Sequence, residues 1–505
     1  MRKIVSLLLA AMMLLGLVPA IAETPASTLE PVTLEWYVAE DSQPDNATVF
    51  AALNEYFQKT INTTINFHFV PYSEYAQKVG PMLDTNQNID IVNANGAINY
   101  VDYAKKGAFA DITELVKEYA PETYAMIPEG YWDAMVIDGS VYGIPSYKDS
   151  CQMFSMHYNA TMAEDLGMDM GSVVIDNAED IIPLLYQAKE LRDAKYPEMA
   201  DLPITRCAME IDRWRQNVNI NSFLSFNVPG VEGFSEYGDN TVFCKYMTKE
   251  YREMSKAVAQ MVDDGLFPYD LFNYDTSRVY DKEGKYFFYD IGSGYVTVSK
   301  DHNGTAFDTA MIPFSANIGS TNYLHNAVEC ISAASQNKER AMMVLEMLNT
   351  DPYVVTTLRF GVEGEHYNVG ADGILDFTGT KNDPALGSRG HYYWYGAQFG
   401  SFVKGAIPAG YPANFFELIE QANQSAITDT NMGFIFDATP VQNEVAACSA
   451  VVDEFTLELT FGYIELEDVD ARIDEVVAKM QANGIDKVVA EAQAQLDAFR
   501  AAQGK

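Results

Sequence analysis

The chain has 505 residues, and its 71 acidic and 33 basic side chains give a formal net charge of −38 at pH 7. Such a charge disfavours binding to nucleic acid or to an anionic membrane surface, because both carry charge of the same sign. Hydrophobic residues make up 48% of the chain, and this length is sufficient for two or more domains, each with its own core.

The first 22 residues have the pattern of a secretory signal peptide. A basic start precedes an almost wholly apolar run over 4–18, and Ala20-Ile21-Ala22 follows as a small-x-small cleavage pattern. The run is short for a membrane span, which disfavours the alternative of an uncleaved anchor. No Cys lies at the cleavage point, so lipidation there is not expected. We therefore predict an exported protein, periplasmic or extracellular and in the cell envelope, in which residues 23–31 form a flexible linker.

Strands and helices alternate in the next part of the chain. Strands are predicted over 32–38, 64–70 and 89–92, and helices over 44–57, 73–83 and 109–119. Strand–helix–strand spacing of this kind predicts a parallel sheet with helices on both faces. Ligands of such sheets bind beyond the carboxyl ends of the strands.

The stretch AMVIDGSVYGIPSY, residues 134–147, has the pattern of a β-hairpin. Asp138-Gly139 is a turn dipeptide that tolerates positive φ at both central positions. Two short apolar strands flank it, and Pro145 ends the ladder because proline has no N–H to donate. The hairpin delivers the chain to an aromatic and two charged residues, Tyr147, Lys148 and Asp149.

The same alternation resumes after the hairpin. Predicted strands cover 151–157, 287–291, 295–298 and 327–333, and predicted helices cover 178–194, 247–267, 337–349, 468–482 and 487–502. Two α/β lobes joined by crossings are the simplest arrangement that fits this order.

Motifs of common enzyme classes are absent from the sequence. There is no GxSxG elbow, HExxH helix, phosphate-binding GxxxxGK[ST] loop or EF-hand loop. The five cysteines form no CxxC or Cys/His cluster and the six histidines do not pair at metal-ligand spacing, so buried free thiols and no metal or cofactor are expected. A glycoside hydrolase would need two positioned carboxylates. Candidate acids are Glu35, Glu40, Asp41, Asp212 and Glu444, and nothing in the sequence pairs any two of them.

Tryptophan is rare and stands in polar surroundings. Aromatic rings beside amides and carboxylates suit a sugar site, because the ring stacks on the C–H face of the sugar while polar groups take its hydroxyls. Trp132 is expected to fill the core. For Trp36, Trp214 and Trp394, ligand contact and core filling are equally supported.

Several longer segments resemble one protein family. GYWDAMVIDGSVYGIPSYKD resembles the segment of family 1 extracellular solute-binding proteins, the carbohydrate-uptake type, in which an Asp-Gly hairpin leads through Gly-Ile-Pro into the first crossing between lobes. IDIVNANGAINYVDYAKKGAFADITELVKEY and NYLHNAVECISAASQNKERAMMVLEMLNTDP are also similar to that family. LRFGVEGEHYNV, GFIFDATPVQNEVAACSAVVDEF and NGIDKVVAEAQAQLDAF resemble a C-terminal domain of unknown function found on one branch, often in lipoproteins of Gram-positive bacteria. That branch usually carries a lipobox Cys, which LVPAIAETPA lacks.

The resemblance implies a two-lobed, periplasmic-binding-protein-like α/β fold of type II, with a mostly parallel sheet flanked by helices in each hinged lobe. The implied N-terminal lobe comprises 32–146 and 297–350, and the C-terminal lobe comprises 147–296 and 351–505, with the family-specific tail from about residue 360. The implied function is that of the substrate-binding component of an ABC importer, not of an enzyme: the lobes close on a solute, which is then delivered to the permease. We expect a monomer that binds a neutral oligosaccharide. A secreted glycoside hydrolase and a binder of peptides or cationic solutes remain the alternatives.

Candidate ligand contacts are selected by their position at strand ends and crossings. Amides there can donate to and accept from neighbouring hydroxyls, glycine lets a ligand approach the backbone, and an Arg beside a carboxylate can clamp hydroxyls. About half of the candidates are expected to line the cleft. The candidates are Trp36, Glu40, Asp41, Asn93, Asn95, Gly96, Tyr147, Asp212, Arg213, Trp214, Tyr289, Tyr295, Asn322, Tyr323, Trp394 and Gln398.

Overall fold

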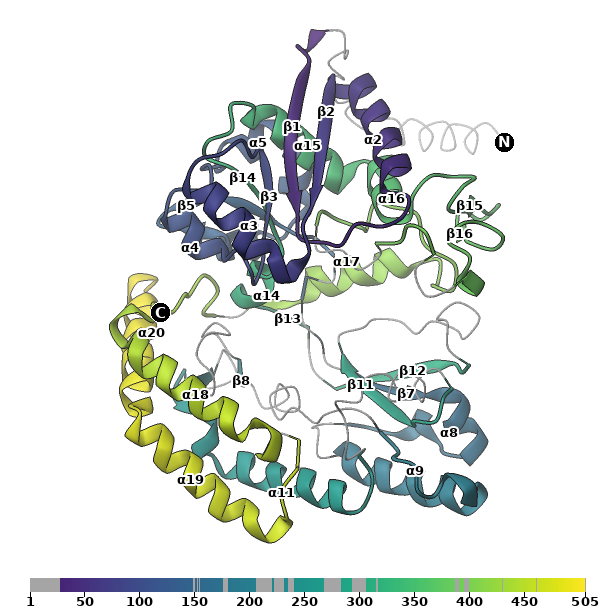
Figure 1. Cartoon of the computed structure of the whole chain (residues 1–505), viewed down its shortest axis with the longest axis vertical. Helices are drawn as coiled ribbons and strands as arrows, with labels where there is room; N and C mark the ends of the chain where they lie inside the picture. The colour runs from purple at the N-terminus through teal and green to yellow at the C-terminus, as the bar shows by residue number, and fades with distance from the viewer. Residues whose placement is uncertain are drawn as a thin grey trace, which may run out of the picture.

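The computed structural model shows a two-lobed α/β protein, with the N-terminal part of the chain in the upper lobe of Figure 1 and the C-terminal helices in the lower lobe. The described residues are 28–504, with gaps at 149, 152, 154, 176–179, 206–219, 222–230, 235–239, 268–282, 293–305, 315–316, 387–389, 395–398, 429 and 460.

A five-stranded sheet of order β2-β1-β3-β14-β6 forms the centre of the first lobe. β1 pairs in parallel with β2 and β3, whereas β14 is antiparallel to both β3 and β6. The predicted alternation of strands and helices is thus confirmed here, with boundaries shifted by a few residues. The strands are β1 (Val32–Val38), β2 (Thr63–Phe69), β3 (Ile91–Ala94), β6 (Gly143–Pro145) and β14 (Val328–Ile331).

Helices cover this sheet and connect its strands (Figure 1). Their apolar faces pack on the sheet; α2, for example, buries Val49, Leu53 and Phe57 at helical spacing. The helices are α2 (Asn46–Ile61), α3 (Tyr72–Asp84), α4 (Tyr100–Lys105), α5 (Leu115–Tyr119), α6 (Pro121–Met126), α7 (Glu129–Ala134), α14 (Thr321–His325) and α15 (Lys338–Thr350).

The predicted helix over 109–119 is wrong in its first half. Phe109 forms an isolated antiparallel bridge with Ser332, so its backbone is committed to the sheet. Helix begins only at Leu115, and Pro121 opens the following helix at its first position, where a missing N–H costs nothing.

The predicted hairpin is confirmed. β4 (Val136–Ile137) and β5 (Ser140–Val141) pair antiparallel. Asp138 and Gly139 have φ values of 50° and 90°, as a type I′ turn requires.

The second lobe contains an antiparallel sheet of order β11-β7-β12, so the expectation of a mostly parallel sheet is wrong for its described strands. Strand direction was not predictable because long connections permit either sense of pairing. Its strands are β7 (Ser155–Asn159), β11 (Phe288–Gly292) and β12 (Thr309–Pro313), and a smaller sheet consists of β8 (Ile220–Asn221), β9 (Val231–Phe234) and β10 (Val242–Cys244).

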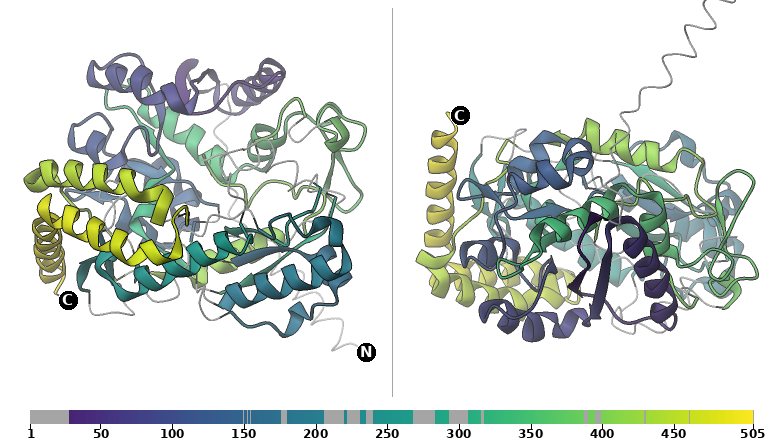
Figure 2. Two further views of the ribbon diagram at one scale, coloured as in Figure 1. Left: turned by 60° about the horizontal axis from the view of Figure 1, so that its bottom comes forward. Right: turned by 90° about the horizontal axis from the view of Figure 1, so that it is seen from above.

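Long helices complete the second lobe, and the tail helices run along one side of the molecule, with α20 at its outer edge (Figure 2). The predicted tail helices and the Gly484 break between them are confirmed, and Gly484 has a φ of 89°. The helices are α8 (Ala160–Leu166), α9 (Ile181–Lys195), α11 (Lys249–Asp263), α18 (Gln442–Leu459), α19 (Val469–Ala482) and α20 (Ile485–Ala502).

The lobe boundaries differ from those expected. Side chains such as Leu358, Trp394 and Phe415 belong to the same core cluster as Trp36 of β1, so the part of 351–505 up to α17 packs on the first lobe. Among the described residues of 351–505, the buried apolar side chains from Phe434 onward join the second core. β12 lies in the second lobe, although 297–350 was expected in the first. An apolar run shows that a segment is buried, but not which of two cores buries it.

The remaining elements are short. α17 lies between the two lobes in Figure 1, and β13 and β17 pair in parallel, which links a crossing to the end of α17. These elements are α16 (Pro352–Phe360), β13 (Ile318–Gly319), β15 (Asn368–Val369), β16 (Leu375–Asp376), α17 (Phe415–Ser425) and β17 (Ile427–Thr428).

Cys151, Cys244, Cys330 and Cys448 are buried, and Cys207 lies outside the described residues. Over the part of the chain that the structure describes, no helix combines the length and the apolar character needed to cross a membrane.

Candidate ligand-binding site

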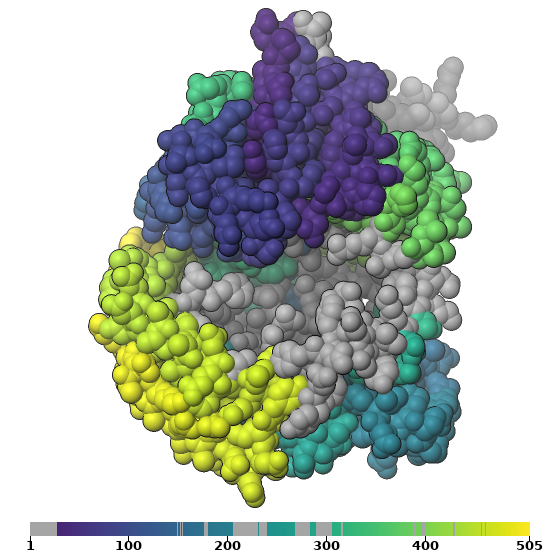
Figure 3. All heavy atoms as spheres, in the orientation of Figure 1, coloured from purple at the N-terminus to yellow at the C-terminus, as the bar shows by residue number. Residues whose placement is uncertain are grey.

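A pocket of about 410 Å³ lies where the first lobe meets the crossings, and Figure 3 shows the molecule hollowed between its upper and lower lobes. Its walls come from the ends of β1 and β3, the start of α3, the first crossing and α14. The lining residues are Val38, Ala39, Glu40, Tyr72, Asn93, Asn95, Gly96, Ser146, Lys148, Ser150, Tyr323, Leu324, Asn326, Ala327 and Phe399.

The pocket lies beyond the carboxyl ends of parallel strands, which is where ligands of such sheets bind. β1 and β3 are parallel, so their carboxyl ends meet at one edge of the sheet. That edge brings together four of the expected residues, Glu40, Asn93, Asn95 and Gly96, and a fifth, Tyr323, comes from α14.

Two asparagines form the floor of the pocket. The Asn95 Nδ2 donates to Asn93 Oδ1 at 2.9 Å, and the Asn93 Nδ2 donates to Glu329 Oε1 at 2.9 Å. Glu329 is 2% exposed. Burial raises its pKa to about 8, although the neighbouring Asn93 amide and Trp36 indole oppose that shift. The floor is therefore a chain of amide hydrogen bonds that ends on a buried carboxyl group.

Tyr72 is an exposed aromatic ring at the pocket. It begins α3, and 58% of the residue is exposed. A Cβ on Gly96 would lie 2.6 Å from the Tyr72 hydroxyl oxygen, so glycine at 96 permits this close approach. Tyr72 is not among the residues predicted from the sequence. Its place just after the second parallel strand was the available signal, because that strand ends at the same edge as β1.

The first crossing contributes alternate residues to the pocket. Ser146, Lys148 and Ser150 line it, whereas Tyr147 is 1% exposed and lies in the first-lobe core. Tyr147, an expected contact, is therefore a core residue, and its hydroxyl accepts a hydrogen bond from Gln424 Nε2 at 3.5 Å.

Two of the candidate tryptophans lie in the core. Trp36 is 1% exposed and Trp394 is 5% exposed. Their rings lie 6.1 Å and 5.6 Å, centroid to centroid, from Phe399, which itself lines the pocket. They support a wall of the site from behind. Trp132 is also in the core, as predicted.

The remaining candidates do not join this pocket. Asp41 and Asn322 are described but are not among its lining residues. Asp212, Arg213, Trp214, Tyr295 and Gln398 lie outside the described residues, and so does the side chain of Tyr289.

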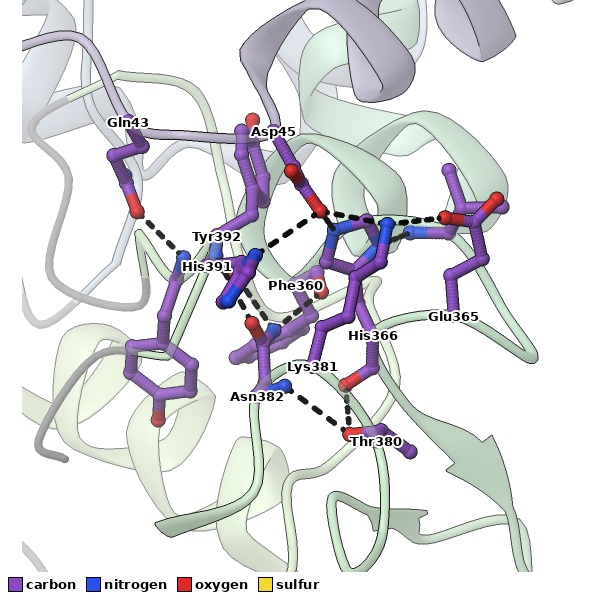
Figure 4. A network of polar contacts seen from close by, with 12 residues as sticks. Gln43, Asp45, Phe360, Glu365, His366, Thr380, Lys381, Asn382, His391 and Tyr392 are labelled. Atoms are coloured by element: carbon purple, nitrogen blue, oxygen red, sulfur yellow. Dashed lines mark hydrogen bonds and ion pairs between the residues drawn. The ribbon is translucent and has the colours of Figure 1, made fainter. Parts of the chain in front are cut away.

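A polar network anchors the loop that carries Glu40 (Figure 4). The Asp45 Oδ2 lies 2.9 Å from the Lys381 Nζ and 3.1 Å from the His366 Nε2. The His366 Nδ1 accepts from the Val362 N–H, so its Nε2 carries the hydrogen that it donates to Asp45. The Tyr393 N–H also donates to Gln43 Oε1 at 2.8 Å. The loop after β1 is thereby fixed to the segment that follows α16.

Electrostatics favour the ionised form of Asp45. Burial would raise the pKa of this carboxyl, but Lys381 and His366 outweigh burial and hold the pKa below its usual value. Burial lowers the pKa of His366 in spite of Asp45. Within the described ranges, no group of three or more His, Cys, Asp or Glu side chains could hold a metal ion.

Two family models and several known proteins are similar to this chain. Residues 40–183 match the model of the family described as bacterial extracellular solute-binding protein. Residues 430–501 match a domain of unknown function, DUF3502. A carbohydrate ABC transporter substrate-binding protein of Streptococcus pneumoniae serotype 4 is 24% identical over 469 residues, which cover 90% of this chain and 89% of the relative.

Solved structures have the same fold over nearly the whole chain. The N-glycan transport solute binding protein of Streptococcus pneumoniae superposes with a TM-score of 0.75 at 22% identity and covers 93% of this chain and 99% of its own. Its complex with Man1GlcNAc gives a TM-score of 0.71 at 21% identity, with coverage of 93% and 99%. An extracellular solute-binding protein of Bifidobacterium longum subsp. infantis gives 0.62 at 16% identity, with coverage of 93% and 98%. The chain is thus similar to bacterial extracellular solute-binding proteins over residues 40–183 and to DUF3502 near its C-terminal end.

Proposed function

We propose that this protein is the substrate-binding component of an ABC importer and that it captures an oligosaccharide outside the cell. The observation that carries the proposal is the pocket itself. It combines an exposed tyrosine ring, Tyr72, with side-chain amides of Asn93, Asn95 and Asn326 at the carboxyl edge of a parallel sheet. This is the combination that a sugar needs, since the ring stacks on C–H groups and the amides bind hydroxyls.

The relatives support this choice of ligand class. A carbohydrate transporter component and an N-glycan transport protein are both similar to this chain over about nine-tenths of its length. Members of the family are binding proteins and not enzymes, so the ligand is returned intact.

The transport step follows from the two-lobed shape. A ligand that contacts both lobes better in the closed form shifts the open–closed equilibrium toward closure. Contacts beyond this pocket would come from the second lobe, where Asp212, Arg213, Trp214, Tyr289 and Tyr295 are the candidates. The closed monomer would then dock on a membrane permease in the cell envelope, without a lipid anchor at residue 22.

The test is thermal unfolding of the exported chain with a panel of defined neutral oligosaccharides that includes mannosyl-N-acetylglucosamine. A ligand at about 100 times its dissociation constant adds about 2.7 kcal/mol of stability, which is readily seen as a shift in Tm. Mass spectrometry of each mixture afterwards shows whether the glycan is intact or shortened. A shift with intact glycan supports the proposal, shortened glycan would indicate a hydrolase, and a shift only with peptides or cationic solutes would replace the ligand class.

A further inference from the structure

A carboxyl group is buried directly behind the pocket floor. Glu329 stands in β14 opposite Asn93 of β3 in the antiparallel register, so the sheet itself places the two side chains together. Glu329 is 2% exposed, and its Oε1 accepts the Asn93 Nδ2 hydrogen bond at 2.9 Å. Burying a carboxyl group opposes folding, and an apolar side chain of similar size is often neutral or stabilising in its place. Its presence here calls for a role besides packing.

The Glu329 oxygen sets the direction of the next amide. This oxygen accepts in the structure, so the nitrogen end of the Asn93 amide faces it and the oxygen end faces away. That Asn93 Oδ1 then accepts from the Asn95 Nδ2 at 2.9 Å. A flipped Asn93 would present its nitrogen to the nitrogen of Asn95, and the hydrogen bond would be lost.

The Asn95 end of this series of hydrogen bonds is fixed as well. The Asn95 Oδ1 accepts from the backbone N–H groups of Ala97 and Ile98 at 2.8 Å and 3.3 Å, which is an Asx-type turn. Both amides therefore have one orientation each. Within the described part of the chain, the Asn95 Nδ2 makes one hydrogen bond, so its second N–H is available to the pocket that Asn95 lines.

We propose that Glu329 is a positioning residue for ligand binding: through Asn93 it fixes the amide of Asn95, so that the pocket floor offers an N–H donor to a hydroxyl or carbonyl oxygen of the glycan. This inference rests on the proposed function. It adds a specificity element, because a ligand with an oxygen acceptor at this position is selected over one that lacks it.

The matched variants separate positioning from packing. Glu329→Gln keeps an acceptor oxygen for Asn93, and because the pKa of Glu329 is about 8, glutamine resembles the neutral carboxyl group that prevails at pH 7. Glu329→Met keeps the size and removes the acceptor. Glu346→Met is the control, since Glu346 accepts from the Glu122 and Thr123 N–H groups at 2.9 Å and does not line the pocket.

Two readouts test the proposal. In protein labelled with ¹⁵N-asparagine, the side-chain amide signals of Asn93 and Asn95 should shift or broaden in Glu329→Met and stay near their wild-type positions in Glu329→Gln and Glu346→Met. In calorimetric titration with mannosyl-N-acetylglucosamine, Glu329→Met should weaken binding about tenfold, while Glu329→Gln restores it. Substitution of Asn93 and Asn95, one at a time, assigns the signals.

The outcomes distinguish this inference from the proposed function. If the disaccharide and the rest of the glycan panel fail to bind the wild type, the proposed function fails, and the amide signals still decide whether Glu329 orients Asn95. Unchanged amide signals in a folded Glu329→Met variant would overturn the inference. So would wild-type affinity of that variant for a disaccharide that binds the wild type.

Discussion

Asn423 of α17 holds the first crossing through the backbone of Lys148. Its Nδ2 donates to the Lys148 carbonyl oxygen at 2.6 Å, and its Oδ1 accepts from the Ser150 N–H at 3.0 Å. Asn423 is 2% exposed, so both hydrogen bonds are shielded from water. The Asn423 side chain thus makes two hydrogen bonds with the crossing backbone, as a neighbouring strand would. These bonds keep Lys148 and Ser150 on the pocket side.

Replacing Asn423 with Ala should destabilise the protein by about 3 kcal/mol, because two buried backbone groups lose their partners. Urea unfolding at pH 7 measures this difference. Gln424→Ala is the control, since within the described residues the Gln424 side chain makes one hydrogen bond, from its Nε2 to the Tyr147 hydroxyl at 3.5 Å, and it should cost less than about 1 kcal/mol. Equal costs for the two variants would show that Asn423 does not brace the crossing.

Replacing Tyr72 with Ala should weaken glycan binding about three- to tenfold, because one aromatic contact contributes about 0.5–1.5 kcal/mol. Stability should hardly change, since 58% of Tyr72 is exposed. Calorimetric titration gives the affinity, Tyr72→Phe should keep it, and Tyr353→Ala removes another exposed ring that does not line the pocket. A loss of affinity in Tyr353→Ala as large as that in Tyr72→Ala would argue against stacking at Tyr72.

His325 should make the fold sensitive to acid. Burial lowers its pKa from 6.5 to about 4, against the hydrogen bond that its Nε2 makes with the Ala134 carbonyl at 2.7 Å. The unfolded chain therefore takes up this proton first, and the stability contributed at neutral pH is lost as the pH falls from about 6.5 to about 4. The loss amounts to roughly 3 kcal/mol.

His325→Gln isolates this contribution, since glutamine keeps an N–H donor for Ala134 and does not titrate. The free energy of unfolding of the wild type, relative to that of the variant, should fall by roughly 3 kcal/mol between pH 7 and pH 4. Comparison with the variant is needed because Glu329, whose raised pKa favours the fold at lower pH, acts in the opposite direction. A difference in unfolding free energy between the two proteins that stays the same from pH 7 to pH 4 would contradict this role of His325.

Asp45→Asn should cost about 1 kcal/mol at pH 7, because Lys381 and His366 lose a charged partner. The pKa of Asp45 is lowered in the folded state, so its contribution is present above its usual pKa of about 3.9 and is lost as the pH falls through the lowered value. Urea unfolding of both proteins at pH 7 and below pH 3 gives the difference in their unfolding free energies. This gap should be present at pH 7 and should disappear on acidification. A gap that stays constant with pH would contradict the ionic role of Asp45.

Much of the first lobe was predictable because its signals are local. Alternation in β1, the helical spacing in α2 and the Asp138-Gly139 turn each depend on a few neighbouring residues. The position of Asn93 and Asn95 at the pocket edge was also predictable, because the carboxyl ends of parallel strands lie at the same edge of a sheet.

The misplaced residues depend on packing between distant segments. Trp36 and Trp394 lie behind Phe399 because α16 and the segment after it pack on the first lobe, which no local pattern shows. Tyr147 faces the core because the crossing is pinned by Asn423, which is 273 residues from Ser150. The buried partner of Asn93, Glu329, lies 236 residues away along the chain and is brought close only by the sheet register.

The most direct test of the central claim is calorimetric titration of the exported chain and of a Tyr72→Ala, Asn95→Ala double variant with the intact glycan that stabilises the protein most. Saturable one-to-one binding by the wild type, lost in the double variant and kept in Tyr353→Ala, is the predicted result. Equal binding by the wild type and the double variant would place the glycan elsewhere, and the absence of binding by any glycan would contradict the proposed ligand class.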